Sequence, residues 1–151
     1  MRIGVISDTH ARSLENIPSQ VKARMEEVDL IVHAGDFTEA KVVEGLRGFG
    51  DMRAVAGNMD SPEVKEMLPS WDIFEANGKR IGVTHGSGGP YDLHERVRQM
   101  FDDVDIIIFG HSHMPFNEVL DGCLLFNPGR AMKSYGILTI EEEVKSEIIK
   151  I

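Results

Sequence analysis

The chain has 151 residues, of which 42% are hydrophobic and 27% charged, which predicts a single domain over residues 1–151 with a sizeable core. A net charge of -9 disfavours binding to long nucleic acids, and no apolar run is long enough for a membrane span. Cys123 is the only cysteine, which excludes an internal disulfide and a thiolate metal cluster. Because residues 1–8 do not have the pattern of a signal peptide, we expect a cytoplasmic protein.

The first predicted strand covers residues 2–6, and Ser7-Asp8-Thr9-His10 follows it. Residues two apart in an extended strand point to the same face, so Asp8 and His10 can aim at one point beyond the strand. A carboxylate and an imidazole that converge at the carboxyl end of a strand suggest a metal site. The alternative is an Asp that caps the next turn beside an unrelated His.

Helices and strands alternate in the next part of the chain. Apolar residues at helical spacing over residues 14–28 predict a helix with Pro18 in its first turn. Residues 29–34 are almost continuously apolar, as buried parallel strands are, and Gly35-Asp36 follows them. A helix opens near Ser61, a plausible cap residue.

Further strands end in the same kind of polar motif. The turn Asn77-Gly78 predicts a hairpin between residues 71–76 and 80–84. The motifs are Gly57-Asn58 after residues 52–56, His85-Gly86 after residues 80–84, and Gly110-His111-Ser112-His113 after residues 105–109.

From Pro115 onward the chain consists of short strands without helices. Two hairpins are predicted, one over residues 116–126 and one over residues 134–151. Alternating strands and helices followed by antiparallel strands predict an α/β fold with two packed sheets and helices outside them.

Polar residues thus follow five predicted strands at the same end, and four of these groups lie beside a glycine. One ion needs about four to six ligands, so this larger set suits two ions that share a bridging carboxylate. Two divalent cations would outweigh the two carboxylates and attract a phosphate ester to an acidic protein. The set comprises Asp8, His10, Asp36, Asn58, His85, His111 and His113.

These motifs, in this order, resemble those of the calcineurin-like metallophosphoesterases, and most closely the small YfcE-type phosphodiesterases. The resemblance covers essentially the whole chain. It implies a two-sheet β-sandwich flanked by helices, in four layers α/β/β/α. It also implies a binuclear metal-dependent hydrolase that cleaves small phosphodiesters by attack of a metal-bridging hydroxide. The quoted motifs are Asp8-Thr9-His10, Gly35-Asp36, Gly57-Asn58, His85-Gly86 and Gly110-His111-Ser112-His113.

The resemblance also implies roles for the individual residues. The expected cofactor is a pair of divalent metal ions, Mn²⁺ or alternatively Ni²⁺, Fe²⁺ or Zn²⁺, and the family suggests a homodimer or tetramer. The residues expected to serve in catalysis as well are Asp36, Asn58 and His111. The implied ligands are Asp8, His10 and His113 for one ion, Asn58, His85 and His111 for the other, and Asp36 as the bridge.

Two positions depart from the family pattern. Met59 stands where many members carry a histidine that serves as proton donor or transition-state contact, and methionine has no proton to give. We therefore expect modest activity on aryl esters and poor activity on alkyl esters. Ser87 stands where close relatives often have a second histidine, which affects substrate contacts but leaves His85 available to the metal.

Other functions stay open at this point. The same site could serve a phosphomonoesterase, and a retromer subunit with this fold works as a non-catalytic interaction scaffold. A mononuclear structural site is a third alternative, but it leaves three of the seven polar side chains unexplained. The complete ligand set favours an enzyme. Nearby, His33 is expected to be buried without binding metal, Asp60 to orient a ligand or cap a helix, and Arg130 to be exposed or to clamp phosphate.

Overall fold

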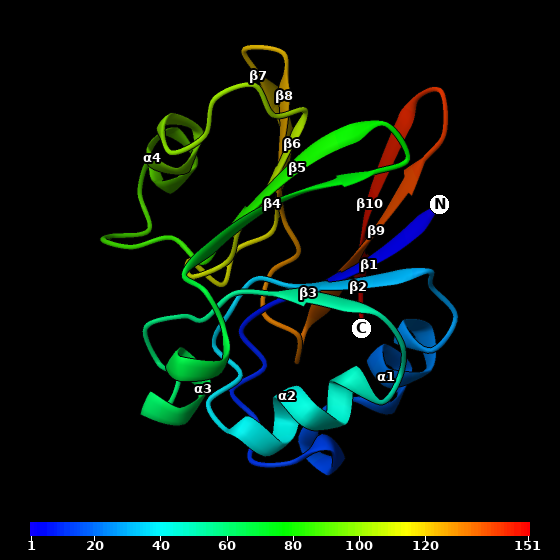
Figure 1. Cartoon of the computed structure of the whole chain (residues 1–151), viewed down its shortest axis with the longest axis vertical. Helices are drawn as coiled ribbons and strands as arrows, with labels where there is room; N and C mark the ends of the chain where they lie inside the picture. The colour runs from blue at the N-terminus through cyan, green and yellow to red at the C-terminus, as the bar shows by residue number, and fades with distance from the viewer.

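The computed structural model describes residues 1–151, which form two five-stranded sheets that pack against each other (Figure 1). The first sheet has the order β10-β9-β1-β2-β3 and the second the order β4-β5-β6-β8-β7. The strands of the first sheet are β1 (Arg2–Ile6), β2 (Leu30–His33), β3 (Met52–Ala54), β9 (Ser134–Ile140) and β10 (Val144–Lys150). Those of the second are β4 (Trp71–Ala76), β5 (Lys79–Thr84), β6 (Ile106–Ile108), β7 (Phe116–Leu120) and β8 (Cys123–Asn127).

Helices cover the outer faces of both sheets, so the molecule has the four layers α/β/β/α that the family resemblance implies (Figure 1). Three helices pack on the first sheet: α1 (Ser19–Met25), α2 (Ala40–Arg47) and α3 (Pro62–Met67). The helix α4 (Leu93–Gln99) packs on the second sheet. None of these helices is both long and apolar enough to cross a membrane.

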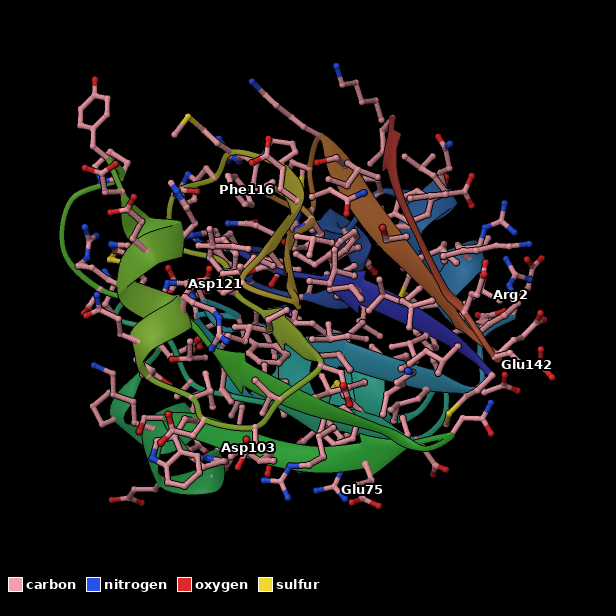
Figure 2. All side chains as sticks on the ribbon, turned by 90° about the horizontal axis from the view of Figure 1, so that it is seen from above. Arg2, Glu75, Asp103, Phe116, Asp121 and Glu142 are labelled. Carbon is pink, nitrogen blue, oxygen red and sulfur yellow. The ribbon has the colours of Figure 1, made fainter.

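The central strands are buried on both faces, which explains their continuous apolar sequence. In β2, Val32 points between the two sheets, whereas Ile31 points to the helices. Full burial of such a side chain contributes about 1.5–3 kcal/mol. Figure 2 shows side chains filling the space between the sheets, while the exposed residues Glu75 and Glu142 lie at the rim.

The helix predicted over residues 14–28 is divided at Pro18. Residues Leu14–Asn16 form a single 3-10 turn, which the Ile17 N–H closes by donating to the Leu14 carbonyl at 3.1 Å. Proline has no N–H, so it cannot continue that hydrogen-bond ladder. The α1 helix begins anew after it, and the Pro18 carbonyl accepts the Val21 N–H at 3.0 Å.

Two other local predictions are confirmed. The Ser61 hydroxyl accepts the Val64 N–H at 3.3 Å and so caps α3, with Pro62 in the first turn. Asn77 and Gly78 both have positive φ, 49° and 86°, as a two-residue hairpin turn between β4 and β5 requires.

Parallel pairing brings the loops that follow the strands to one edge. β1 pairs parallel to β2 with Ile6 opposite His33, so the Asp8 N–H donates to the Gly35 carbonyl at 3.0 Å. In the second sheet β5 pairs parallel to β6, and the Gly110 N–H donates to the His85 carbonyl at 3.1 Å. The polar motifs of both sheets therefore face each other across the sandwich.

Candidate metal centre

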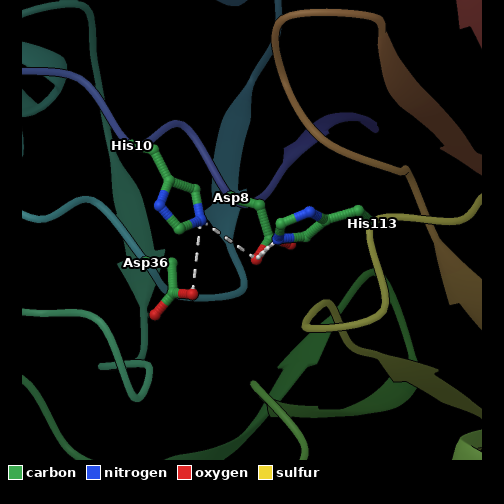
Figure 3. Close-up of side chains that lie close together, drawn as sticks. All are labelled: Asp8, His10, Asp36 and His113. Atoms are coloured by element: carbon green, nitrogen blue, oxygen red, sulfur yellow. Dashed lines mark ion pairs between the residues drawn. The ribbon is translucent and has the colours of Figure 1, made fainter. Parts of the chain in front are cut away.

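Four polar side chains meet where the two sheets converge: Asp8, His10, Asp36 and His113 (Figure 3). Their ligand atoms all lie within 4.8 Å of one another, so they could hold a metal ion. The His10 Nε2 atom lies 3.7 Å from Asp8 Oδ1 and 3.4 Å from Asp36 Oδ2. The His113 Nε2 atom, which comes from the second sheet, lies 3.3 Å from Asp8 Oδ1. We call these four residues the first cluster.

Two buried atoms of the first cluster have no hydrogen-bond partner, namely Asp8 Oδ1 and His10 Nε2. The other oxygen of Asp8 accepts hydrogen bonds from the Ser7 hydroxyl at 2.7 Å and the His111 N–H at 3.2 Å. A buried carboxylate oxygen without a partner is costly, by about 1–3 kcal/mol or more for a charged group. A metal ion bound at this point would remove that cost, so the unpartnered atoms fit a metal site.

The remaining three predicted residues, Asn58, His85 and His111, form a second cluster beside the first. Asn58 Oδ1 lies 3.1 Å from His85 Nε2 and 3.2 Å from His111 Nδ1. His85 Nε2 also lies 3.2 Å from Asp36 Oδ2, the same oxygen that faces His10. The structure thus brings all seven predicted side chains together, with Asp36 between the two clusters.

Oxygen acceptors surround the His85 ring. Its Nδ1–H donates to the Ala34 carbonyl at 2.7 Å, and its Nε2 faces the Asp36 carboxylate and the Asn58 amide oxygen. Burial lowers the pKa of His85, but the hydrogen bond and the negative charges of Asp36 and Asp8 outweigh it, so the pKa is raised. A metal ion bound at Nε2 would compete with protonation of this nitrogen.

The contact between His85 and Asp36 also lowers the pKa of the Asp36 carboxyl. Burial raises the pKa of Asp36, but the hydrogen bond and charge of His85 outweigh it and lower the pKa. The Met59 N–H contributes as well, since it donates to Asp36 Oδ1 at 2.8 Å. Asp36 therefore stays ionised to a lower pH than an ordinary aspartate.

Five of the seven residues adopt left-handed backbone conformations, which residues other than glycine rarely do. Such strain collects at functional sites, where the surrounding structure enforces it. The close approach of the loops also requires Gly57, because a Cβ atom there would collide with the Asp36 carboxylate. The φ values are 53° for Asp8, 44° for His10, 63° for Asp36, 71° for His111 and 64° for His113.

Asp60 fixes the loops that carry Asn58 and Asp36. Its carboxylate accepts backbone N–H groups from Gly57 at 2.7 Å, Asp36 at 3.0 Å and Thr38 at 2.7 Å, and it is 5% exposed. The sequence did not distinguish whether Asp60 orients a ligand or caps a helix. The structure supports the first role, because Ser61 caps α3 instead.

His33 is fully buried, as predicted. Its Nδ1 accepts the Gly35 N–H at 3.1 Å, so Nε2 carries the proton and donates to the Thr9 hydroxyl at 3.2 Å. Burial, aided by the charge of His85, holds the pKa of His33 well below its usual value. The ring stacks on Phe37 with 3.5 Å between centroids, so His33 acts as a neutral support for the neighbouring loops.

Arg96 is a residue near the site that the sequence analysis missed. Its guanidinium donates to the Ser87 carbonyl at 2.9 Å, to the Tyr91 carbonyl at 2.8 Å and to the Gly89 carbonyl. On the other side of this loop, His111 Nε2–H donates to the Gly88 carbonyl at 2.7 Å. The glycine-rich loop is therefore fixed at both faces. The Ser87-Gly88-Gly89 sequence alone indicates only a flexible loop.

Comparisons with known proteins identify the family of this chain. The sequence matches the family described as the calcineurin-like phosphoesterase superfamily domain over residues 1–143. The probable metallophosphoesterase MJ0623 of Methanocaldococcus jannaschii is 37% identical over 164 residues, which cover 100% of this chain and 82% of that protein. The phosphodiesterase MJ0936 of the same organism is 30% identical over 173 residues, which cover 99% of each.

Solved structures show the same architecture. The solution structure of protein TM1076 of Thermotoga maritima superimposes with a TM-score of 0.80 at 34% identity and covers 99% of both chains. Vps29 of Entamoeba histolytica superimposes with a TM-score of 0.77 at 22% identity, over 100% of this chain and 99% of that chain, which shows a shared fold. The family model and the relatives together confirm the resemblance carried by the strand-end motifs, and the chain belongs to the calcineurin-like phosphoesterase superfamily.

Proposed function

We propose that the protein is a metal-dependent phosphodiesterase that hydrolyses small phosphodiesters with two divalent ions. One observation carries the proposal: Asp8 Oδ1 and His10 Nε2 are buried without hydrogen-bond partners at the point where seven polar side chains converge. The phosphoesterase family and a relative named as a phosphodiesterase support the reaction class.

The ligand assignment follows the two clusters. Asp36 would serve both ions, since its Oδ2 lies 3.4 Å from His10 Nε2 and 3.2 Å from His85 Nε2. Nitrogen and oxygen ligands suit manganese, with nickel, iron and zinc as alternatives. When bound, such ions polarise phosphoryl oxygens and lower the pKa of the attacking water. The proposed ligands are Asp8, His10 and His113 for one ion and Asn58, His85 and His111 for the other.

The chain itself contributes orientation and charge to the reaction. Hydrolysis adds water across one phosphorus–oxygen bond and gives a phosphomonoester and an alcohol, whose oxygen needs a proton unless it leaves as a stable anion. Met59 cannot donate that proton, and its side chain is 57% exposed beside the second cluster. Aryl oxides leave without protonation, so the site fits aryl diesters better than alkyl diesters.

The direct test uses metal-stripped protein and a matched pair of aryl phosphate esters, one a monoester and one a diester. Manganese, nickel or zinc is added back, with no metal as control. Metal-restored cleavage of the diester supports the proposal and identifies a competent ion. Preference for the monoester would instead indicate a phosphomonoesterase with the same site.

A Met59→His variant tests the explanation for leaving-group preference. We expect it to raise the rate on an alkyl diester by about tenfold or more, within the range of positioned general acids, and to change the aryl rate little. An unchanged alkyl rate would count against the role assigned to position 59. Met114→His is the control, because Met114 is also exposed and lies outside the seven-residue set.

Because Vps29 has the same fold, a non-enzymatic protein-interaction scaffold is the alternative function. The complete set of seven converging side chains argues for catalysis, since a scaffold gains nothing from a full ligand set. Protein that binds two ions per chain and cleaves no ester would favour the scaffold.

A further inference from the structure

A cavity of about 640 Å³ opens directly beside the second cluster. Asn58 and His85 form part of its wall, so it adjoins the proposed metal centre. The remaining wall comes from α3 and the segment after it, from the loop after β5, and from Met100 beyond α4. A phosphoryl group held at the metal centre could therefore extend one of its ester groups into this cavity.

The charge of the cavity wall differs from that of the protein as a whole. Lys65 is the one lysine or arginine that lines it, and no aspartate or glutamate does, although the chain carries 25 acidic residues and a net charge of -9. The Lys65 Nζ lies 3.5 Å from the Asn58 carbonyl oxygen, which places the ammonium group next to the second cluster. A wall with one cation and no carboxylate favours an anionic occupant.

The rest of the wall suits a short organic group. Leu68, Pro69 and Met100 offer apolar surface, and Ser70 and Ser87 offer hydroxyl groups. Part of this wall is rigid, because Arg96 holds the Ser87 carbonyl at 2.9 Å. The cavity thus combines a partly fixed wall with the positive charge of Lys65.

We propose that this cavity binds the ester group that stays on phosphorus, and that Lys65 selects for a second negative charge on that group, a carboxylate or a phosphate. This inference rests on the proposed phosphodiesterase function, which it deepens by naming a substrate class. It assigns Lys65 as a specificity-determining residue that contacts the substrate and binds no metal.

The test compares three para-nitrophenyl phosphodiesters that share a leaving group and differ in the retained group, which is propyl, carboxyethyl or phosphonoethyl. Wild type is compared with Lys65→Gln and with the control Lys41→Gln, an exposed lysine of α2 that does not line the cavity. We expect wild type to prefer the anionic diesters by about fivefold in kcat/KM, a typical value for one solvated charge pair. Lys65→Gln removes this preference and leaves the propyl diester unchanged, whereas Lys41→Gln keeps it.

Binding is measured separately from hydrolysis, by calorimetry with phosphonate monoesters in which a methyl group replaces the aryloxide. We expect tighter binding of the carboxyethyl or phosphonoethyl ligand, and loss of that difference in Lys65→Gln; the better of the two identifies the anion. Equal binding of all three ligands, or no binding, overturns the inference. If binding depends on Lys65 but no diester is cleaved, the subsite stands and the proposed hydrolysis fails. If the diesters are cleaved without a preference for the charged groups, the proposed hydrolysis stands and the proposed Lys65 subsite fails.

Discussion

The two clusters differ in how their ligand atoms are satisfied without metal. In the first cluster, Asp8 Oδ1 and His10 Nε2 are buried without a hydrogen-bond partner. In the second, Asn58 Oδ1 faces two imidazole nitrogens, and His111 also donates to the Gly88 carbonyl at 2.7 Å. A cation entering the first cluster relieves a cost, whereas one entering the second must replace existing hydrogen bonds. We therefore expect the first cluster to bind a metal ion more tightly than the second cluster.

Asp36 connects the two clusters, so its loss has the largest expected effect. Asp36→Asn keeps the shape but removes the shared negative charge, and we expect hydrolysis to fall by about a thousandfold, or ~4 kcal/mol in transition-state stabilisation. The measurement is kcat/KM for the aryl diester at saturating metal.

Circular dichroism of the same variant separates catalysis from folding. Asp121→Asn, in the exposed turn between β7 and β8, is the matched control and should keep full activity. A folded, inactive Asp36→Asn fits the enzyme. Loss of fold alone would point to a structural metal site.

Asp60 supports both clusters through the backbone. Asp60→Ala leaves three buried or half-buried N–H groups without their carboxylate acceptor, so we expect the free energy of unfolding to fall by about 3 kcal/mol. Urea denaturation of metal-free protein measures this change. Glu66→Ala, an exposed residue of α3, should change it by less than about 0.5 kcal/mol. A similar small loss for both variants contradicts the supporting role.

Metal titration tests the difference between the clusters directly. The second cluster must give up about two hydrogen bonds, each worth about 1 kcal/mol, so we expect its ion to bind at least about tenfold more weakly. Calorimetry with Mn²⁺ should resolve two affinities. His113→Ala should remove the tighter one and His111→Ala the weaker one, while His94→Ala, outside both clusters, should keep both. A single affinity would falsify the ordering.

The smallest expected effect is the pH dependence of stability in metal-free protein. The pKa of Asp36 is lowered from 3.8, so its contribution is present above that value and is lost as pH falls through the folded-state pKa. The pKa of His85 is raised from 6.5, so its contribution is present below that value and is lost as pH rises through the folded-state pKa. The ion pair therefore stabilises most between pH 3.8 and 6.5.

The measurement is thermal unfolding across pH in the presence of a chelator. The stability difference between wild type and His85→Gln should be largest inside that window and shrink on either side. A difference that stays constant with pH shows that the pair makes no ionic contribution.

Much of the fold follows from local sequence patterns. The continuous apolar character of residues 29–34 indicates a strand covered on both faces, and β2 is buried throughout. Asn77-Gly78 specifies its turn because both residues tolerate positive φ. The position of Pro18 between the 3-10 turn and α1 could not be predicted from the sequence. A proline can follow a 3-10 turn, but it can also lie within the first turn of an α-helix.

The residues that meet at the site could be predicted from the sequence, because the carboxyl ends of parallel strands share one edge and each motif follows a strand. Their electrostatic state could not be predicted in this way. The Asp8 oxygen without a hydrogen-bond partner, the contact between His85 and Asp36, and the position of Lys65 all depend on how the two sheets and α3 pack. Desolvation and hydrogen bonding depend on contacts between segments that are distant in sequence, and the local sequence pattern does not predict these contacts.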